Sequence, residues 1–257
     1  MAIQVYFIGA GPGDLELLTI KAKNLIEKAD VIIYADSLVN PGVRSLAKDE
    51  AEVYGSASLT LAEINDIVVN AVRQGKTVAR LQSGDPSVYG AIQEQMASMD
   101  ANGIQYQVIP GVSSLFAAAA TLKTELTIPG LSQTVIITRM EGKTPVPKKE
   151  KLSSLADHQT TMAIFLSSSL IEQAVKELIA GGYPDRTPTA IVYRASWDDE
   201  IVIRSNLKDI TEKANAAGIK RQALILVGNA LDTRQAIGHY SRLYDESFSH
   251  GYRNKGL

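Results

Sequence analysis

The sequence predicts an α/β protein with two domains: a mostly parallel sheet with flanking helices, followed by a mixed sheet with helices. Short apolar runs alternate with amphipathic stretches of helical length, which is the pattern of parallel strands joined by helices. Runs in the first half end in glycine-containing turns. Two later runs are separated only by "ASWDD", a spacing that favours an antiparallel hairpin.

The first half of the chain supplies the parallel sheet. Its expected strands are 5–9, 31–35, 77–81 and 106–110. Over residues 16–28, apolar side chains recur at intervals of three or four positions, as on one face of a helix. Thr60 and Glu63 have the spacing of a capping box, which predicts a helix start. We assign residues 1–120 to this N-terminal domain.

The second half follows a different pattern, which begins near "TELTIPGLSQ" at 124–133. Its expected strands are 134–139, 161–166, 188–194, 200–205 and 222–228, with helical stretches at 169–180 and 206–216. The antiparallel hairpin makes this a mixed sheet. We assign residues 121–235 to this C-terminal domain and 236–257 to a tail that is expected to pack on the surface or fray.

The composition excludes several classes of partner and site. A net charge of −2 gives no general attraction to nucleic acid or to an anionic membrane, so neither is expected as a partner. The absence of cysteine excludes disulfides and thiolate zinc sites, and it suits a reducing compartment. The histidines form no metal pattern, so no protein-bound metal is expected. They are His158, His239 and His250.

The chain also lacks the segments that would direct it to a membrane. Its longest apolar stretch, 115–122, is far shorter than the ~20 residues of a membrane-spanning helix. The first residues reach glycine without the basic region of a signal peptide. We therefore expect a cytoplasmic protein.

The turn "GAGPGD" at 9–14 resembles a dinucleotide-binding loop only in part. It has the first two glycines of the fingerprint G-x-G-x-x-G, but Asp14 stands at the third position. The negative charge of Asp14 would repel a phosphate, and Pro12 has no N–H to donate to one. A nicotinamide cofactor is therefore disfavoured. A tight structural turn and a site for a different ligand both remain open.

Two further turns follow strands of the same half, in "LQSGDPSVYG" (81–90) and "IPGVSSLFAAAA" (109–120). Pro86 favours an extended Asp85 at the carboxyl end of a strand, where open α/β sheets bind their ligands. A helix cap is the alternative role of this carboxylate. Ser113 and Ser114 stand at a helix start, where hydroxyl groups and backbone amides can bind a ligand. Three such turns on three strands of one half favour a functional role more than any one of them does alone.

These turns, together with "VIIYADSLV", resemble the signature segments of the tetrapyrrole methylases, the uroporphyrinogen/corrin/porphyrin methyltransferases, over residues 3–229. "SGDPSVYGAIQEQ", "ELTIPGLSQTVIITRMEGKTPVP" and "FLSSS" are similar to the branch that methylates C11 of precorrin-4 or cobalt-precorrin-4 in cobalamin biosynthesis. The resemblance implies S-adenosyl-L-methionine as cofactor, S-adenosyl-L-homocysteine as product, a cofactor site in a cleft between the domains, and a homodimer. It also implies an anionic tetrapyrrole substrate, in which any cobalt belongs to the substrate.

The resemblance extends to individual residues. The implied cofactor-binding residues are Pro12, Ser83, Gly84, Asp85, Val88, Ser113, Ser114, Leu166, Ala195, Ala223 and Leu224. Asp36 is the expected catalytic residue, because uroporphyrinogen members have an acid/base aspartate at this position. Their partner lysine is replaced by Ser56, which argues against the uroporphyrinogen reaction. Asp36 is a candidate for orienting the ring or stabilising its charge, and a strand-end turn residue is the alternative.

The acetate and propionate groups of such a substrate would require cationic side chains around it. The candidates are Arg80, Arg139 and Lys143, and each could equally be a solvated surface charge. Trp197, in the expected hairpin turn, is interpreted as packing or a dimer contact.

The expected chemistry requires neither a covalent nucleophile nor a metal, because the methyl group of the cofactor is already activated. The protein has to align donor and acceptor, which can contribute up to ~7–11 kcal/mol. Three alternatives remain open. They are a methyltransferase of the same fold with another acceptor (another corrin position, uroporphyrinogen, diphthine or ribosomal RNA), a nicotinamide-dependent oxidoreductase and a non-catalytic tetrapyrrole carrier.

Overall fold

The structure, a computed structural model, describes residues 2–232, 238–239, 241 and 248–249. The chain divides into two compact units. Unit 1 comprises Met1–Ala117 and Arg194–Asp199, and unit 2 comprises Ala118–Tyr193 and Glu200–Leu257. The predicted domain boundary after residue 120 stays a prediction, and the sequence did not indicate that Arg194–Asp199 belongs with unit 1. The predicted tail, 236–257, lies mostly outside the described residues.

Unit 1 contains a five-stranded sheet in the order β3-β2-β4-β1-β5, and every neighbouring pair is parallel. The strands are β1 (Val5–Gly9), β2 (Val31–Tyr34), β3 (Glu52–Gly55), β4 (Val78–Gln82) and β5 (Tyr106–Ile109). The predicted parallel sheet is thus confirmed. The sequence did not indicate β3, because this edge strand is half-exposed and carries a charged residue.

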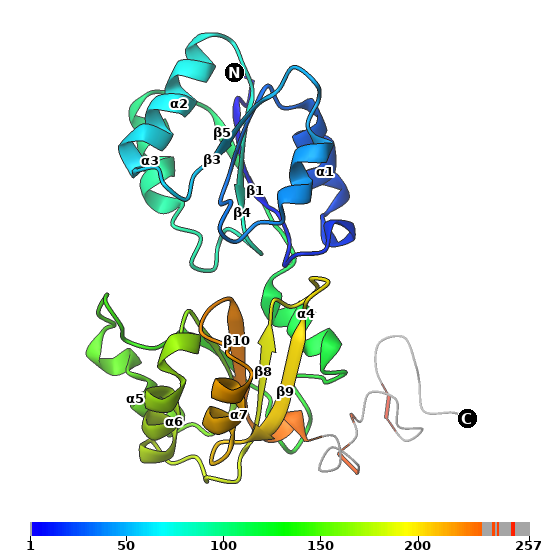
Figure 1. Cartoon of the computed structure of the whole chain (residues 1–257), viewed down its shortest axis with the longest axis vertical. Coiled ribbons are helices and arrows are strands. Elements are labelled where there is room, and N and C mark those ends of the chain that lie inside the picture. Colours follow the sequence, from blue (N-terminus) through cyan, green and yellow to red (C-terminus); the bar gives the residue numbers. More distant parts are fainter. Residues whose placement is uncertain (1, 233–237, 240, 242–247, 250–257) are drawn as a thin grey trace. The chain divides into compact units, whose positions relative to one another are not determined.

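Helices cover both faces of this sheet, α1 on one face and α2 and α3 on the other (Figure 1). Neighbouring residues of β2 point to opposite faces, so that Ile32 packs with Ile26 of α1, and Ile33 with Val68 of α2. This burial on both faces explains why β2 is a continuous apolar run. The helices are α1 (Ile20–Lys28), α2 (Leu61–Arg73), α3 (Gln93–Ala101) and α4 (Ser114–Thr121), and α4 continues into unit 2.

Unit 2 contains a mixed sheet in the order β6-β7-β10-β8-β9. Only β6 and β7 are parallel, and the other pairs are antiparallel, including the predicted hairpin of β8 and β9. The mixed sheet and the hairpin are thereby confirmed. The strands are β6 (Val135–Arg139), β7 (Thr161–Phe165), β8 (Pro188–Tyr193), β9 (Ile201–Asn206) and β10 (Ala223–Val227).

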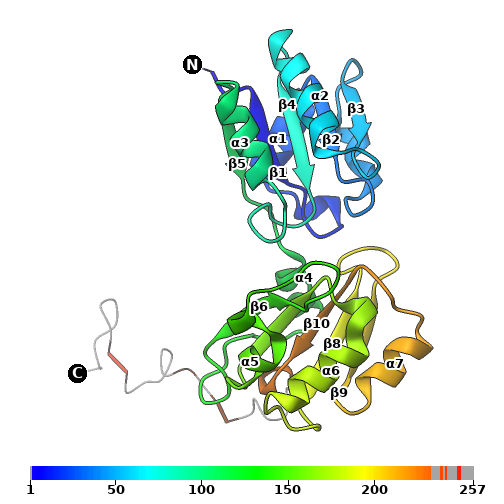
Figure 2. The same cartoon turned by 90° about the vertical axis from the view of Figure 1, so that its left-hand side faces the viewer.

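Three helices cover one face of this second sheet (Figure 2). They bury Leu152, Leu178 and Ile210 against Met162 and Ile225 of the strands. The short α5 was not predicted, because it follows a polar loop that is rich in lysine and proline. The helices are α5 (Leu152–Ala156), α6 (Ile171–Ala180) and α7 (Ile210–Ala216).

Shorter features complete the fold. Thr60 and Glu63 form the predicted capping box at the start of α2. No helix in the described part of the chain is both long enough and apolar enough to cross a membrane. Short 3-10 helices lie at Leu15–Leu17, Pro41–Leu46, Lys148–Glu150, Ser168–Leu170 and Asn229–Leu231.

Candidate functional site

The three glycine turns meet at the carboxyl end of the unit 1 sheet, and their backbones touch. A Cβ atom on Gly111 would lie 2.2 Å from the carbonyl oxygen of Gly84 and 2.7 Å from the Cα of Gly9. A Cβ on Gly9 would lie 2.5 Å from the Cα of Gly111. Gly84 adopts φ +64°, a conformation that favours glycine. Glycine is therefore required at all three positions.

Hydrogen bonds join the same turns. Gly84 N–H donates to the carbonyl of Gly11 at 2.8 Å, and Gly11 N–H donates back to Gly84 at 3.3 Å. One oxygen of Asp85 accepts from Gly111 N–H at 2.9 Å, and the other accepts from Ser87 N–H at 2.9 Å. Asp85 thereby connects the second turn to the third.

The environment of Asp85 favours its ionised form. Partial burial alone would raise its pKa, but the hydrogen bonds from Ser87 and from Gly111 N–H outweigh that effect and hold the pKa below the usual value. The carboxylate is therefore charged at neutral pH. Its contacts give it an organising role in the turns, and direct cofactor binding by Asp85 stays a prediction.

The third turn leads into the start of α4. Ser113 is buried, and its carbonyl accepts the first helical bonds, from Phe116 and Ala117. Its hydroxyl also accepts from Leu115 N–H at 3.3 Å. The first amides of a helix have no partner within the helix, so this end, which begins at Ser114, suits an anionic group.

The opening loop is a tight turn that side chains from two distant segments hold in place. Three consecutive residues of the loop each have a backbone group bound by one side chain. The bonds are Trp197 Nε1–H to Pro12 O at 2.9 Å, Asn40 Nδ2–H to Gly13 O at 2.8 Å, and Asp14 N–H to Ser196 Oγ at 3.0 Å. Asp14 also accepts from Glu16 N–H, which explains an aspartate in place of a third glycine.

The sequence did not indicate the partners of this loop. No sequence motif pointed to Ser196 or Asn40 as partners of the loop, and Trp197 was interpreted only as packing or a dimer contact. A large aromatic residue in a turn between strands was the one cue available, because turns usually carry small polar residues. The structure shows that Trp197 packs within unit 1, against the opening loop.

Asp36 lies just beyond β2, at the same end of the sheet. It is exposed, and its Oδ1 accepts a hydrogen bond from Ala57 N–H at 2.7 Å. Ser56, which replaces the lysine of uroporphyrinogen members, is buried and donates to the carbonyl of Tyr34 at 3.1 Å. Asp36 therefore closes a turn, and its catalytic role stays a prediction.

Arg80 is buried and hydrogen-bonded to groups of the protein. It is only 5% exposed, because every residue of the central strand β4 is buried. Its guanidinium donates to Gln95 Oε1 at 3.0 Å and to the carbonyls of Ile33 and Leu81. Burial lowers its pKa to about 10, so it stays charged at neutral pH. Contact of Arg80 with substrate carboxylates stays a prediction.

Arg139 and Lys143 lie on unit 2, in and after β6. Arg139 donates to the carbonyls of Met140, Thr144 and Pro145, the last at 2.7 Å. It thereby anchors the loop whose exposed residues include Lys143. Of the predicted cations, Lys143 is thus the one that lies in an exposed position.

The remaining predicted residues divide between the units. Val88 and Ala195 belong to unit 1, whereas Leu166, Ala223 and Leu224 belong to unit 2. Ala223 and Leu224 open β10, where Leu224 is buried. A metal site is not apparent, since no group of three or more His, Asp or Glu side chains that could hold an ion occurs in the part of the chain that is described.

Leu166 has an unusual conformation for its residue type. It is 67% exposed and adopts φ +53°, a region that L-residues rarely occupy. Ser167 fixes the turn by accepting from Met140 N–H at 2.9 Å and donating to the carbonyl of Phe165 at 2.6 Å. An exposed apolar side chain held in a strained backbone is typical of functional positions.

The sequence match identifies the family. Residues 4–211 match the Tetrapyrrole (Corrin/Porphyrin) Methylases, and the chain belongs to this family. It is 59% identical over 250 residues to the cobalt-precorrin-4 C(11)-methyltransferase of Methanocaldococcus jannaschii, covering 97% of this chain and 96% of that protein.

Solved structures agree with the family and the fold. The structure of a cobalt precorrin-4 methyltransferase, CbiF, a cobalamin biosynthetic enzyme, matches with a TM-score of 0.87 and 48% identity, covering 89% of this chain and 96% of that one. A uroporphyrin-III C-methyltransferase from Thermus thermophilus, complexed with S-adenosyl homocysteine, matches with a TM-score of 0.75 and 31% identity, covering 90% and 94%.

Proposed function

We propose that the protein transfers the methyl group of S-adenosyl-L-methionine to C11 of cobalt-precorrin-4, giving cobalt-precorrin-5 in cobalamin biosynthesis. The observation that carries this proposal is the 59% identity to a cobalt-precorrin-4 C(11)-methyltransferase over nearly the whole length of both chains. The match to the CbiF structure supports the same acceptor. Both names specify cobalt, which favours a substrate that already contains the metal over metal-free precorrin-4.

The carboxyl end of the unit 1 sheet fits the proposed cofactor. The close packing of Gly9, Gly84 and Gly111 brings the three turns together at one place, where one ligand could reach all of them. The start of α4 at Ser113 and Ser114 suits the carboxylate of the cofactor. The related structure in complex with S-adenosyl homocysteine supports the choice. When bound, the cofactor supplies an activated methyl group.

The residues of the chain then have to position the acceptor and balance its charge. Alignment of the methyl donor and the acceptor carbon can lower the barrier by up to ~7–11 kcal/mol. Accurate positioning should therefore contribute more to the rate than a strong base. We assign Asp36 the role of orienting the tetrapyrrole or stabilising charge on it. Lys143 is the proposed contact for an acetate or propionate group, and Arg139 anchors the loop that carries it.

We further propose a cytoplasmic homodimer. The resemblance to the family supports the dimer, and the cysteine-free sequence suits a reducing compartment. Light scattering coupled to gel filtration tests the assembly, and a monomeric mass at micromolar concentration would contradict it.

The direct test incubates the purified protein with cobalt-precorrin-4 and S-adenosylmethionine that carries a ¹³C methyl group. The expected result is one new methyl carbon at C11 of the ring. Transfer to another carbon, or transfer only to uroporphyrinogen or diphthine, would replace the proposed acceptor with that one.

Calorimetry distinguishes a methyltransferase from the two other classes of protein, an oxidoreductase and a tetrapyrrole carrier. The proposal predicts tight binding of S-adenosylhomocysteine and no binding of a nicotinamide dinucleotide. Binding of the dinucleotide alone would indicate an oxidoreductase. Binding of the tetrapyrrole without S-adenosylhomocysteine would indicate a carrier.

The role of Asp36 has its own test. Asp36→Asn should lower turnover about tenfold and change its pH profile, because the charge near the ring is lost. Asp49→Asn, at another exposed aspartate, is the matched control and should behave like the wild type. Unchanged turnover across pH in Asp36→Asn would leave the residue with only its turn-closing bond to Ala57.

A further inference from the structure

The turn between β8 and β9 contains Trp197, whose indole packs directly on the backbone of Gly13. A Cβ atom on Gly13 would lie 2.1 Å from Cδ1 of Trp197 and 2.2 Å from its Nε1. These distances leave no room for any side chain at position 13 unless the indole moves. The glycine and the indole therefore fit together as a matched pair within unit 1.

Two residues of this turn also hydrogen-bond the loop on either side of Gly13. Trp197 Nε1–H donates to the carbonyl of Pro12, and Ser196 Oγ accepts from Asp14 N–H. Pro12 has no N–H of its own, so its carbonyl is the one backbone polar group through which it can be oriented. The β8–β9 turn thus controls the part of the loop that the family resemblance places beside the cofactor.

The turn itself is rigid. The guanidinium of Arg194 lies over the indole, with its carbon 3.9 Å from the ring centroid, and pairs with Asp199. Arg194 and Ser196 adopt φ +47° and +68°. Residues other than glycine rarely adopt positive φ unless surrounding contacts hold them there. Such backbone conformations cluster at functional sites.

We propose that Trp197 is a positioning residue for methyl transfer, one that holds the Pro12 loop in its reactive geometry. The inference rests on the proposed function. The other two turns are joined to each other by Asp85 and by glycine contacts. Loss of Trp197 should therefore leave cofactor affinity largely intact and impair turnover, because misalignment of about 1 Å can cost ~100-fold in rate.

The test compares Trp197→Phe, which keeps a ring but removes the N–H donor, with the wild type. We expect kcat for methyl transfer to fall at least tenfold, while the Kd for S-adenosylhomocysteine, from calorimetry, changes less than threefold. Asp198→Asn, an exposed position in the same turn, is the matched control and should leave both values within twofold of wild type. Circular dichroism verifies that each variant is folded.

A double-mutant cycle tests the fit of the matched pair. Gly13→Ala alone should lower kcat at least tenfold, because its Cβ would strike the indole. In a Trp197→Ala background the same substitution should cost less than threefold, since the obstructing ring is gone. Additive effects in the cycle would contradict the proposed contact.

Fluorescence separates this inference from the proposed function. Trp197 is the single tryptophan of the chain, so all indole emission comes from position 197. Gly13→Ala should shift that emission to longer wavelength whether or not cobalt-precorrin-4 is methylated. Failure of the wild type to methylate cobalt-precorrin-4 would overturn the proposed function, whereas a shifted emission in Gly13→Ala would still support the contact between Trp197 and the loop. Unchanged emission in Gly13→Ala, or a Trp197→Phe variant with kcat within twofold of wild type, would overturn the positioning role.

Discussion

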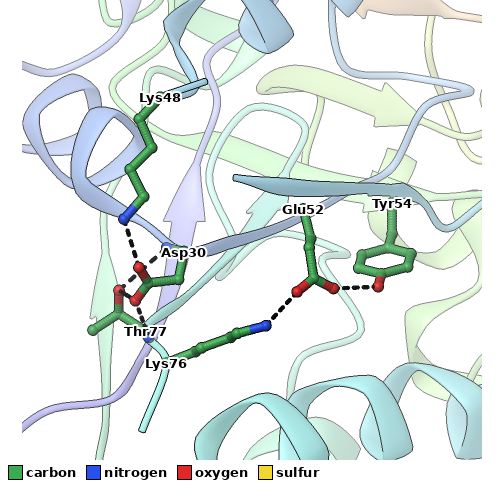
Figure 3. Close-up of polar contacts among 6 residues, drawn as sticks. All are labelled: Asp30, Lys48, Glu52, Tyr54, Lys76 and Thr77. Atoms are coloured by element: carbon green, nitrogen blue, oxygen red, sulfur yellow. Dashed lines mark hydrogen bonds and ion pairs between the residues drawn. The ribbon is translucent and has the colours of Figure 1, made fainter. Parts of the chain in front are cut away.

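The two ends of the unit 1 sheet are held together in different ways. At the carboxyl end, glycine backbones touch, and one carboxylate connects two turns. At the amino end, the strands are joined through charged side chains (Figure 3). Since all five strands are parallel, the two ends have the same strand geometry and differ only in the residues that follow or precede the strands.

Two groups of side chains occupy the amino end. Asp30 accepts from Lys48 at 2.5 Å and from the N–H and hydroxyl of Thr77 at 2.7 and 2.8 Å. Lys76 pairs with Glu52, and the hydroxyl of Tyr54 donates to the same carboxylate at 2.6 Å (Figure 3). The hydrogen bonds and the Lys48 charge lower the pKa of Asp30 to about 2.

The two ends should therefore differ in how well they tolerate substitutions. Ion pairs at a partly exposed surface contribute ~1 kcal/mol or less each, so losing one of them is tolerated. The glycines that pack backbone to backbone cannot be replaced, because any side chain would occupy the space that the neighbouring turn fills. The carboxyl end thus has little tolerance for change, and the amino end has more.

The largest expected effect comes from Gly111→Ala, which places a Cβ 2.2 Å from the carbonyl of Gly84. We expect a loss of about 3 kcal/mol in the free energy of unfolding, because overpacking a fixed backbone forces it to move. S-adenosylhomocysteine binding should weaken at least 100-fold. Urea denaturation and calorimetry measure the two effects. Gly142→Ala, which meets only a side-chain atom at 3.4 Å, should change neither.

Asp85→Asn should have the next largest effect. The substitution replaces one carboxylate oxygen with an NH₂ group, which donates and cannot accept. Depending on the orientation of the amide, either Gly111 N–H or Ser87 N–H loses its acceptor. A donor without an acceptor costs ~1–3 kcal/mol when it is fully buried, and Asp85 is partly buried, so we expect about a tenfold loss of S-adenosylhomocysteine affinity. Ser87→Ala, which removes one donor to Asp85, should cost less than threefold. Equal affinities for Asp85→Asn and wild type would contradict the organising role of this carboxylate.

Asp30→Asn should lower stability without affecting binding. We expect on the order of 1 kcal/mol at pH 7, since solvent screens this pair, and unchanged S-adenosylhomocysteine affinity. The folded-state pKa near 2 lies below the ordinary 3.8, so the unfolded chain takes up the proton first as the pH falls. The stabilisation is therefore complete above about pH 4 and is lost between pH 4 and 2.

Urea denaturation of both proteins between pH 7 and 3 tests this sign. The difference between wild type and Asp30→Asn should shrink below pH 4. A difference that grows on acidification would mean that the ionised carboxylate does not stabilise the fold.

The smallest effect is expected for Lys76→Met, which removes the ion pair with Glu52 at the exposed edge strand β3. Its melting temperature should fall by less than that of Asp30→Asn. The difference in melting temperature from wild type should shrink in ~1 M salt, because salt weakens ion pairs that are exposed to solvent. Persistence of the difference at high salt would indicate a packing contribution from the lysine stem.

The sequence predicted the elements whose signal is local. The apolar runs of β1, β2 and β4 and the capping box at Thr60 are readable because burial on both faces and helix capping each leave a pattern in neighbouring residues. The edge strand β3 was not predicted, since half-exposed residues lack such a pattern.

The candidate site was predictable only in part, for the same reason. The glycine turns stand out in the sequence, but their mutual contact depends on strand order. Arg80 was predicted to be an available cation, yet β4 is a central strand buried on both faces, and strand order is not encoded locally. The contact of Trp197 with Gly13 joins segments far apart in the chain, and no local pattern encodes it.

A crystal structure of the protein with S-adenosylhomocysteine tests the central claim most directly, namely that the carboxyl end of the unit 1 sheet forms part of the methyl-transfer site. We predict that the ligand contacts the turns at Gly84–Asp85 and Ser113–Ser114, with the Pro12 loop unchanged against Trp197. A ligand bound at the amino end of the sheet, or one that contacts none of the three glycine turns, would contradict the claim.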